Sequence, residues 1–240
     1  VQGAFGAFTV TLKLWPQVVT LHLLGGLSVL SLLLLLWLSL RRRAAHLKVT
    51  AEQHKAGADA AHIRRQPWLA TLAAALLLGQ LALGGWTSSN YAGLACEGFP
   101  ACNGAAWPAM DWGEGFHLTQ DVGPSYLHGQ LHGEARTAIH MAHRGGAVLL
   151  GAVLLALYWR QRRHLPARKA APDNPWRWAL GCWLVQAGLG IANVLWWLPL
   201  DLALAHTLGA VALTLAMVWA MDRMRQAARR KRASVSQALA

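Results

Sequence analysis

Five long apolar runs divide the chain, and polar segments separate them. Each run reaches the roughly 20 residues that an α-helix needs to cross a bilayer. The runs are Pro16–Leu40, Pro67–Thr87, Ala138–Trp159, Trp178–Trp197 and approximately Leu200–Met221. A cleaved signal peptide does not explain the first run, because it is too long and its basic cluster follows it. We therefore expect an all-α integral membrane protein with five transmembrane helices, the last four forming an antiparallel four-helix bundle.

Charged residues alternate between the two sides of these runs. The chain has 22 Lys and Arg against 10 Asp and Glu, a net charge of +12. The basic residues gather at 41–65, 160–177 and 223–232, whereas the segments after the second and fourth runs carry acidic residues. This is the positive-inside pattern, so we expect the basic loops and the C-terminus in the cytoplasm and the 88–137 loop outside. Because the charge follows the membrane topology, we expect no nucleic-acid partner.

Two cysteines, Cys96 and Cys102, lie six positions apart in the outer loop. Zinc normally needs three or four ligands, and no further ligands are obvious nearby. Covalent haem attachment is not indicated, because the chain has no Cys-x-x-Cys-His motif. Paired thiols in an oxidising compartment tend to be oxidised, which favours a disulfide whose role as a staple or a redox pair stays open. Cys182, inside the fourth run, is predicted to be an ordinary buried thiol.

The chain contains an internal repeat at an offset of 184 residues. The matching pairs are Val1 and Val185, Gln2 and Gln186, Gly6 and Gly190, His22 and His206, and Gly25 and Gly209. A further copy of the first part is Gln80-x3-Gly84, and His143-Arg-Gly-Gly completes it. In each copy a Gln-x3-Gly motif near the outer end of one helix precedes a helix with an early His and a following Gly.

The repeat predicts how the chain divides. Gln186 lies well inside a predicted helix, yet its counterpart Gln2 is the second residue, so we expect a spanning helix to continue upstream of Val1 and the chain to be N-terminally truncated. Residues 1–40 would then hold the last helix of an incomplete first half, and 67–225 a complete second half with its outer loop at 88–137. Basic cytoplasmic segments at 41–66 and 226–240 complete the division.

Three histidines occur at one predicted depth. His22, His143 and His206 lie five or six residues into their spans, roughly 8–9 Å below the outer end at about 1.5 Å per residue. Ionisable residues inside membrane spans are functional candidates. Two imidazoles facing each other across an apolar bundle suit the iron of a haem, so we expect ligation there. His140 is an alternative to His143, which is favoured because its Arg-Gly-Gly context matches the repeat.

Residues around these histidines allow two interpretations. The small residues Gly145, Gly146, Gly209 and Ala210 leave room for a macrocycle or serve close helix packing. Arg144 is a candidate partner for a haem propionate, or it extends to the outer interface. No third metal ligand is evident beside His128 and His132, which with His117 we expect to be solvated. No chemistry is expected of His46, His54, His62 and His164 in the basic loops.

Four strings of the sequence resemble the haem A synthase family in its bacterial form. They are GGWTSSNYAGLACEGFPACNG, IHMAHRGGA, AHTLGA and VQGAFGAFTVTLKLWPQVVTLHLLGG, and the cysteine-loop string is the most specific. The resemblance implies eight spans in two pseudo-symmetric halves. It implies a b-type haem between His143 and His206, His22 as one axial ligand of a substrate haem, and a disulfide between Cys96 and Cys102. The catalytic acidic residues of the family, in a Glu-x-x-Glu region, would lie upstream of Val1.

The resemblance implies an oxidoreductase that converts the methyl substituent of haem O to the formyl group of haem A. The cofactor would be haem b, and the location the bacterial inner membrane, with the cysteine loop periplasmic. Haem O synthase, terminal oxidase assembly factors and membrane lipid are the implied partners, and a homo-oligomer is compatible with the sequence. The 240-residue chain alone is expected to be inactive.

Two other classes of function fit parts of the pattern. A bis-His membrane cytochrome would use the histidines for electron transfer without substrate chemistry. A periplasm-facing thiol oxidase would pass electrons from Cys96 and Cys102 to a membrane quinone, and it would not need His143 or His206.

Overall fold

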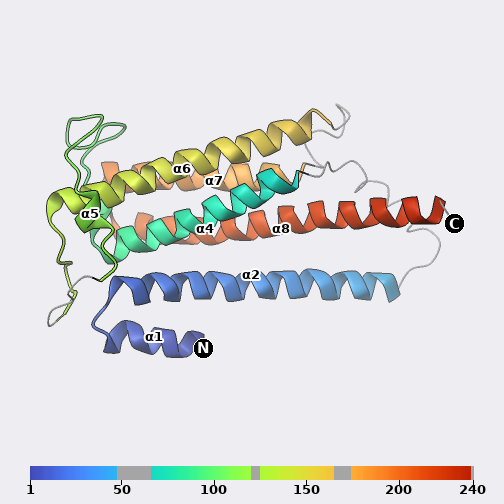
Figure 1. Ribbon diagram of the computed structural model, residues 1–240, viewed down its shortest axis with the longest axis horizontal. Coiled ribbons are helices and arrows are strands. Elements are labelled where there is room, and N and C mark those ends of the chain that lie inside the picture. Colours follow the sequence, from blue (N-terminus) through green and yellow to red (C-terminus); the bar gives the residue numbers. More distant parts are fainter. Residues whose placement is uncertain (48–65, 120–124, 165–173, 239–240) are drawn as a thin grey trace.

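Helices make up the regular structure of the described residues. The computed structural model describes residues 1–47, 66–119, 125–164 and 174–238 (Figure 1). Its elements are α1 (Gln2–Thr11), α2 (Pro16–Leu47), α4 (Pro67–Ser89), the 3-10 helix η3 (Ala92–Leu94), α5 (Trp112–Gly115), α6 (Gly133–Arg162), α7 (Trp176–Leu195) and α8 (Leu200–Ala238). Five of them, α2, α4, α6, α7 and α8, are long and apolar enough to cross a membrane. The predicted all-α membrane fold is confirmed.

Three helix ends differ from the sequence prediction. Helix α2 continues through Arg41, Arg42 and Arg43 to Leu47, and α8 continues to Ala238, so segments predicted as a loop and a tail are helical where they are described. Arg and Lys are good helix formers, and cations are favourable near a helix C-terminus. Helix α6 begins at Gly133 rather than Ala138, and Glu134 in its first turn favours this N-terminus. The basic positions within 48–65 and 165–173 lie outside the described residues.

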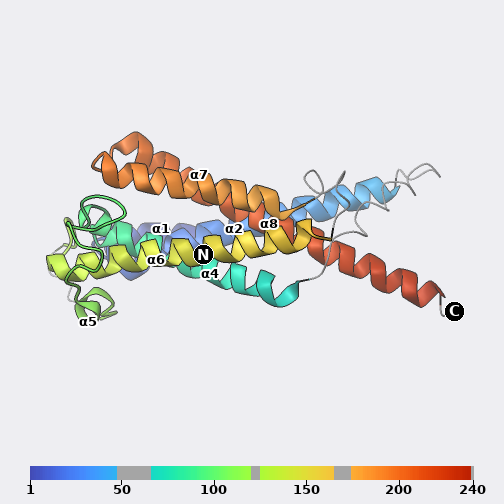
Figure 2. The ribbon, with the colours of Figure 1, turned by 90° about the horizontal axis from the view of Figure 1, so that it is seen from above.

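The last four long helices pack as neighbours along the chain. Helix α4 packs on α6, α6 on α7, and α7 on α8, and α4 also touches α8. Helix α2 lies against α4 and α8, and the short α1 folds back along α2 (Figures 1 and 2). The Cys96–Cys102 loop, α5 and the turns between α1 and α2 and between α7 and α8 gather at one end of the molecule (Figure 1).

The buried residues of the bundle form two clusters, and a band without buried residues lies between them. The main core joins α4, α6, α7 and α8 towards the end that carries the C-terminus, and its members include Leu77, Leu150, Leu154, Leu213 and Met217. A smaller cluster under the outer loops contains Trp86, Ala92, Leu131, Ala135 and Ile139. No residue is buried in the stretches 78–84, 141–149, 180–192 and 200–212 between these clusters. This band contains both His143 and His206.

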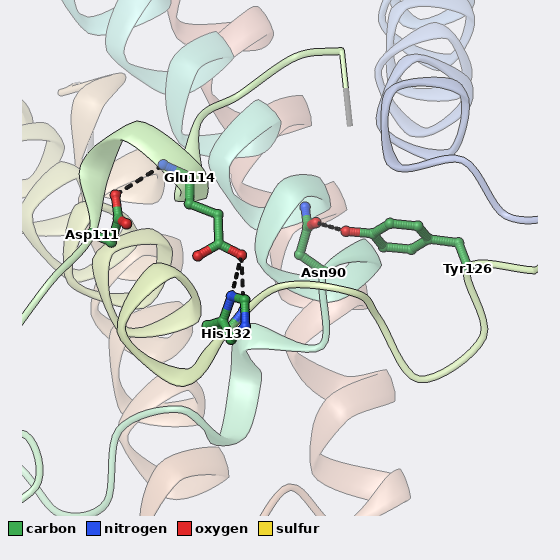
Figure 3. Close-up of polar contacts among 5 residues, drawn as sticks. All are labelled: Asn90, Asp111, Glu114, Tyr126 and His132. Carbon is green, nitrogen blue, oxygen red and sulfur yellow. Dashed lines mark hydrogen bonds and ion pairs between the residues drawn. The ribbon is translucent and has the colours of Figure 1, made fainter. Parts of the chain in front are cut away.

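The outer loop is held by polar contacts between its own segments (Figure 3). The Asp111 carboxylate accepts from the Glu114 backbone N–H at 2.9 Å, and the Glu114 carboxylate contacts His132 Nδ1 at 2.9 Å. The Tyr126 hydroxyl donates to Asn90 Oδ1 at 2.6 Å, and both side chains are fully buried. Burial raises the pKa of the Tyr126 phenol above its usual value. These contacts fix the loop over the outer end of the bundle.

The same outer loop also contacts the turn between α1 and α2. The Tyr126 backbone N–H donates to the Lys13 carbonyl at 3.1 Å. The Gln17 side chain donates to the Leu118 carbonyl. At the opposite end of α2, Arg42 forms an ion pair of 2.7 Å with Asp222 of α8. Helix α2 is therefore tied to the rest of the molecule at both ends.

Candidate functional site

His143 of α6 and His206 of α8 face each other inside the bundle. Their ring centroids are 6.4 Å apart and their planes are inclined by 71°. Two imidazoles that share one metal ion at about 2 Å each place their nitrogens about 4 Å apart and their ring centres roughly 6 Å apart. The observed spacing therefore matches that of two axial ligands to one metal. The two rings are adjacent, and the predicted ligation by His143 and His206 stays a prediction.

A glutamine from the preceding helix contacts each of these histidines. Gln80 Nε2 donates to the His143 backbone carbonyl at 3.0 Å and lies 3.1 Å from the ring nitrogen Nδ1. Gln186 Nε2 donates to the His206 carbonyl at 2.8 Å, whereas His206 Nδ1 is buried without a hydrogen-bond partner among the described residues. In both histidines the backbone carbonyl accepts a hydrogen bond from a glutamine, but only the ring of His143 is also contacted by that glutamine.

Two glycines complete each contact. A Cβ on Gly84 would lie 3.3 Å from His143 Cε1, and one on Gly190 would lie 3.2 Å from His206 Cε1, so each ring rests against the backbone of the neighbouring helix. A Cβ on Gly146 would overlap Oε1 of Gln80. A Cβ on Gly209 would likewise overlap Oε1 of Gln186. The Gln-x3-Gly and His-x2-Gly spacings therefore form one packed unit, which we call the Gln–His cassette.

A third Gln–His cassette joins α1 to α2. Gln2 Nε2 donates to the His22 carbonyl at 2.5 Å and lies 3.1 Å from His22 Nδ1. A Cβ on Gly6 would lie 3.2 Å from His22 Cε1, and one on Gly25 would overlap the Gln2 amide. The geometry repeats that of the bundle, but among the described residues no other histidine makes a ring contact with His22.

His140 has a different environment from His143. It is buried, and its Nδ1 lies 2.8 Å from the carbonyl oxygen of Ala92 in η3. The ring is thus directed to the outer loop, one turn away from the ring that faces His206. Of the two candidates on α6, the structure pairs His143 with His206.

Arg144 holds the cysteine loop. Its guanidinium donates to the carbonyls of Gly98 at 2.9 Å, Ala101 at 3.2 Å and Pro100 at 3.3 Å, and it also lies over the ring of Phe99. Cys96 and Cys102 close this loop as a disulfide, which confirms the predicted bond. Sequence reasoning missed the three carbonyl partners of Arg144, because they follow from the conformation of a loop more than 40 residues away. A propionate contact of Arg144 stays a prediction.

The outer histidines form no metal site in the described part of the chain. His132 pairs with Glu114, His128 lies near the ring of Tyr91, and His117 contacts Thr119. No group of three or more His, Cys, Asp or Glu side chains that could hold a metal ion occurs among the described residues. The candidate ligands are therefore the two facing imidazoles, with the remaining positions left to a macrocycle.

The surroundings of His143 and His206 fit a haem. The donor set consists of two imidazoles, which haem iron accepts as axial ligands. The helix stretches around them contain no buried side chain, although the two buried clusters lie on either side. These stretches are mostly apolar and include Gly84, Gly146 and Gly190. A bundle with facing histidines in an apolar band defines the class of protein: a multi-pass membrane protein with a candidate bis-His haem site.

Comparison with known proteins identifies the family. The family model of the cytochrome oxidase assembly protein COX15-CtaA matches residues 1–218, so the chain belongs to this family, and the predicted membership is confirmed. A haem A synthase from Shewanella oneidensis is 41% identical over 219 residues, covering 90% of this chain and 61% of the relative. A haem A synthase from Paramagnetospirillum magneticum is 29% identical over 187 residues, covering 77% and 46%. No solved structure gives a significant match.

The chain spans about three fifths of the length of the first relative and less than half of the second.

Proposed function

We propose that this chain is part of a haem A synthase and takes part in haem A biosynthesis. The observation that carries the proposal is the pairing of His143 and His206 at 6.4 Å between α6 and α8. Family membership and relatives named haem A synthase support the same function. In this proposal the bundle of α4, α6, α7 and α8 holds a b-type haem, and α1 with α2 contributes to a substrate site.

The residues of the bundle bind and orient the cofactor. His143 and His206 would hold the haem iron through their ring nitrogens, and the backbones at Gly84 and Gly190 support the rings. The apolar stretches of the four helices accept the macrocycle, while the outer loop covers the end of the bundle. When bound, a b-type haem supplies one-electron transfer.

His22 is proposed to bind the substrate haem O. It belongs to a Gln–His cassette like those of the bundle, at the corresponding position of the repeat. The net conversion oxidises a methyl group to a formyl group. With water as the oxygen source, the methyl group and one water give the formyl group, four protons and four electrons. An electron acceptor outside this chain must take those electrons.

The proposal includes an orientation in the membrane. The basic segments face the cytoplasm, and the disulfide loop faces the periplasm of a bacterial inner membrane. Anionic lipid is a proposed partner of the basic C-terminal part of α8, because clustered Arg and Lys attract the charged headgroups. Haem O synthase and oxidase assembly factors are proposed protein partners, since haem O must arrive from a synthase and haem A must pass to an oxidase.

A visible spectrum of histidine variants tests the bundle site. We expect the purified chain to show a low-spin b-type reduced-minus-oxidised spectrum, which His143→Ala and His206→Ala each abolish. The matched control is His140→Ala, a buried histidine on the same helix that contacts Ala92 instead. Unchanged spectra in both ligand variants would contradict the site, and loss only in the control would assign the ligand to His140.

Pigment extraction separates the synthase from an electron-transfer cytochrome, which would share the His143–His206 pair. With a haem O source and the whole synthase present, haem A should accumulate and should disappear in a His22→Ala variant that retains the b-type spectrum. A cytochrome would form no haem A under any of these conditions. A thiol oxidase would instead keep its activity in His143→Ala and lose it in Cys96→Ser.

A further inference from the structure

The three Gln–His cassettes are the most regular feature of the structure beyond the histidines themselves. In each copy the glutamine reaches the neighbouring helix, and its amide nitrogen donates a hydrogen bond to the histidine carbonyl at 2.5, 3.0 or 2.8 Å. In each copy its oxygen lies where a Cβ of the following glycine would be. Helix packing alone does not require an amide at this position three times, because an apolar residue of similar size fills the same space.

The cassette determines which edge of the imidazole is covered. For His143 the ring atoms nearest to the adjoining helix are Cε1 and Nδ1, which lie 3.3 and 3.9 Å from a Cβ on Gly84. The Gln80 amide nitrogen lies on the same Nδ1 edge, at 3.1 Å. No described residue forms a hydrogen bond with Nε2 of His143 or His206. For His143 the neighbouring helix thus contacts Nδ1 and leaves Nε2 for a ligand, whereas for His206 it holds only the backbone carbonyl.

A contact of this kind restricts rotation of the imidazole ring about χ2. The histidine χ2 torsion is broad and roughly two-fold, so packing and hydrogen bonds must select the ring plane. Groups that contact the non-ligating nitrogen of a metal-bound histidine help to fix the orientation of the ring. The Gln80 amide nitrogen is a donor, so it cannot accept the Nδ1 proton or raise the basicity of the ligand; it can hold the backbone carbonyl and restrict the ring plane.

We propose that Gln80 and Gln186 are positioning residues for the haem ligands His143 and His206, and that Gln2 has the same role for His22. The inference rests on the proposed ligation of haem by these histidines. Gln80 contacts Nδ1 of its histidine, whereas Gln186 contacts only the backbone carbonyl. Gln80 therefore restricts the ring plane of one ligand and holds its backbone, whereas Gln186 holds only the backbone of the other.

The first experiment replaces the glutamines in the haem-loaded chain. In Gln80→Leu we expect haem affinity to fall about 10–100-fold, measured as transfer to excess apomyoglobin. The low-spin ferric EPR signal, which depends on the relative orientation of the two ring planes, should broaden. Gln80→Glu should lower the midpoint potential, because a carboxylate can accept the Nδ1 proton and the amide nitrogen cannot. Gln186→Leu should alter the EPR signal less than Gln80→Leu. The control is Gln66→Leu, a buried glutamine at the other end of α4.

A second pair of variants tests the same contact without removing the amide. In Gly146→Ala the new Cβ would overlap Oε1 of Gln80, so the amide must move. In Gly145→Ala the new Cβ meets nothing within 4 Å, which makes it a matched control on the adjacent residue of α6. We expect Gly146→Ala to broaden the EPR signal and shift the midpoint potential, and Gly145→Ala to leave both as in the parent chain.

The ligand variants distinguish failure of this inference from failure of the proposed function. If His143→Ala loses the haem while Gln80→Leu and Gly146→Ala keep the parent EPR signal and potential, the ligation stands and the positioning role is wrong. If His143→Ala keeps the parent spectrum, the proposed haem site itself is wrong. Broadened EPR signals in Gln80→Leu and Gly146→Ala, with the parent signal in Gly145→Ala, support the positioning role, because leucine fills the space of the glutamine without its amide contact.

Discussion

The α4–α8 bundle and the α1–α2 pair contain the same local unit in different surroundings. In the bundle, two Gln–His cassettes are arranged so that His143 faces His206. In α1 and α2, Gln2 holds His22 in the same way, but no described histidine faces it. Two neighbouring helices are therefore enough to orient one ring. Pairing two rings needs the packing of a complete bundle.

The sharpest test of this comparison replaces equivalent histidines in the two regions. In the 240-residue chain we expect His206→Ala to eliminate tightly bound haem and His22→Ala to leave it unchanged, because one imidazole cannot supply both axial nitrogens. The measurement is the haem-to-protein ratio after size-exclusion chromatography, which should be close to one in the parent chain and in His22→Ala. Loss of haem in His22→Ala, or a second tightly bound haem in the parent chain, would show that the two regions are not separate sites.

The next largest effect is expected at the outer cap, which the disulfide loop forms over the bundle. Replacing Cys96 and Cys102 together by Ser opens a short loop, and the chain-entropy model gives a loss of about 2–3 kcal/mol in the free energy of unfolding. Arg144 then loses the fixed carbonyls of Gly98, Pro100 and Ala101. We expect a lower thermal unfolding midpoint in detergent with the bis-His spectrum retained. The control is Cys182→Ala, and equal midpoints for parent and double variant would contradict the predicted stabilisation.

Hydropathy predicted the five spans because a membrane helix must satisfy its own backbone and needs an apolar length set by the bilayer. It could not locate helix ends outside the hydrocarbon layer, so Leu47 and Gly133 were missed as boundaries. The repeat predicted His143 and His206, because equal positions in duplicated helix pairs lie at equal depth. Its glutamines were visible only as sequence markers. Their contacts with the His carbonyls depend on how neighbouring helices pack, which the spacing of Gln80 and Gly84 does not specify.

A smaller effect is expected where the two regions are joined by α2 and α8, at the end opposite the disulfide loop. Arg42 of α2 donates to Asp222 of α8 at 2.7 Å, and Gln226 donates to the same carboxylate oxygen. Asp222 is 8% exposed, while the Arg42 side chain is 36% exposed, so solvent screens part of the attraction. Asp222→Asn should therefore lower the free energy of unfolding by about 1–2 kcal/mol.

The effect of Asp222→Asn should be confined to the contact between α2 and α8. Limited proteolysis should cut near the C-terminal end of α2 faster in the variant, while the His143–His206 spectrum stays as in the parent chain. Asp201→Asn is the control, since Asp201 is an exposed acidic residue at the other end of the same helix. A changed spectrum in Asp222→Asn would mean that α2 contributes to the bundle site.

The smallest effect concerns the outer contact between the regions, at Tyr126. Its hydroxyl donates to Asn90 Oδ1 at 2.6 Å, its backbone N–H donates to Lys13 O, and Asn90 in turn donates to Trp86 O of α4. Tyr126→Phe keeps the ring and removes the hydroxyl, which leaves a buried amide oxygen with one partner fewer. We expect a loss of about 1 kcal/mol in the free energy of unfolding.

The same variant makes a pH prediction with a defined sign. Burial raises the pKa of Tyr126 in the folded protein above the ordinary tyrosine value of 10.0, so the folded state keeps the phenol proton that the unfolded chain releases. The contribution of Tyr126 to stability is therefore fully present below about pH 10 and falls as the pH rises towards the folded pKa. Unfolding midpoints between about pH 8 and about pH 11 should fall more steeply in the parent chain than in Tyr126→Phe, so the two curves converge at alkaline pH. Tyr91→Phe, at an exposed outer-loop tyrosine, should follow the parent curve. Parallel curves for the parent chain and Tyr126→Phe would contradict the prediction, because they would mean that the Tyr126 hydroxyl does not cause the loss of stability at alkaline pH.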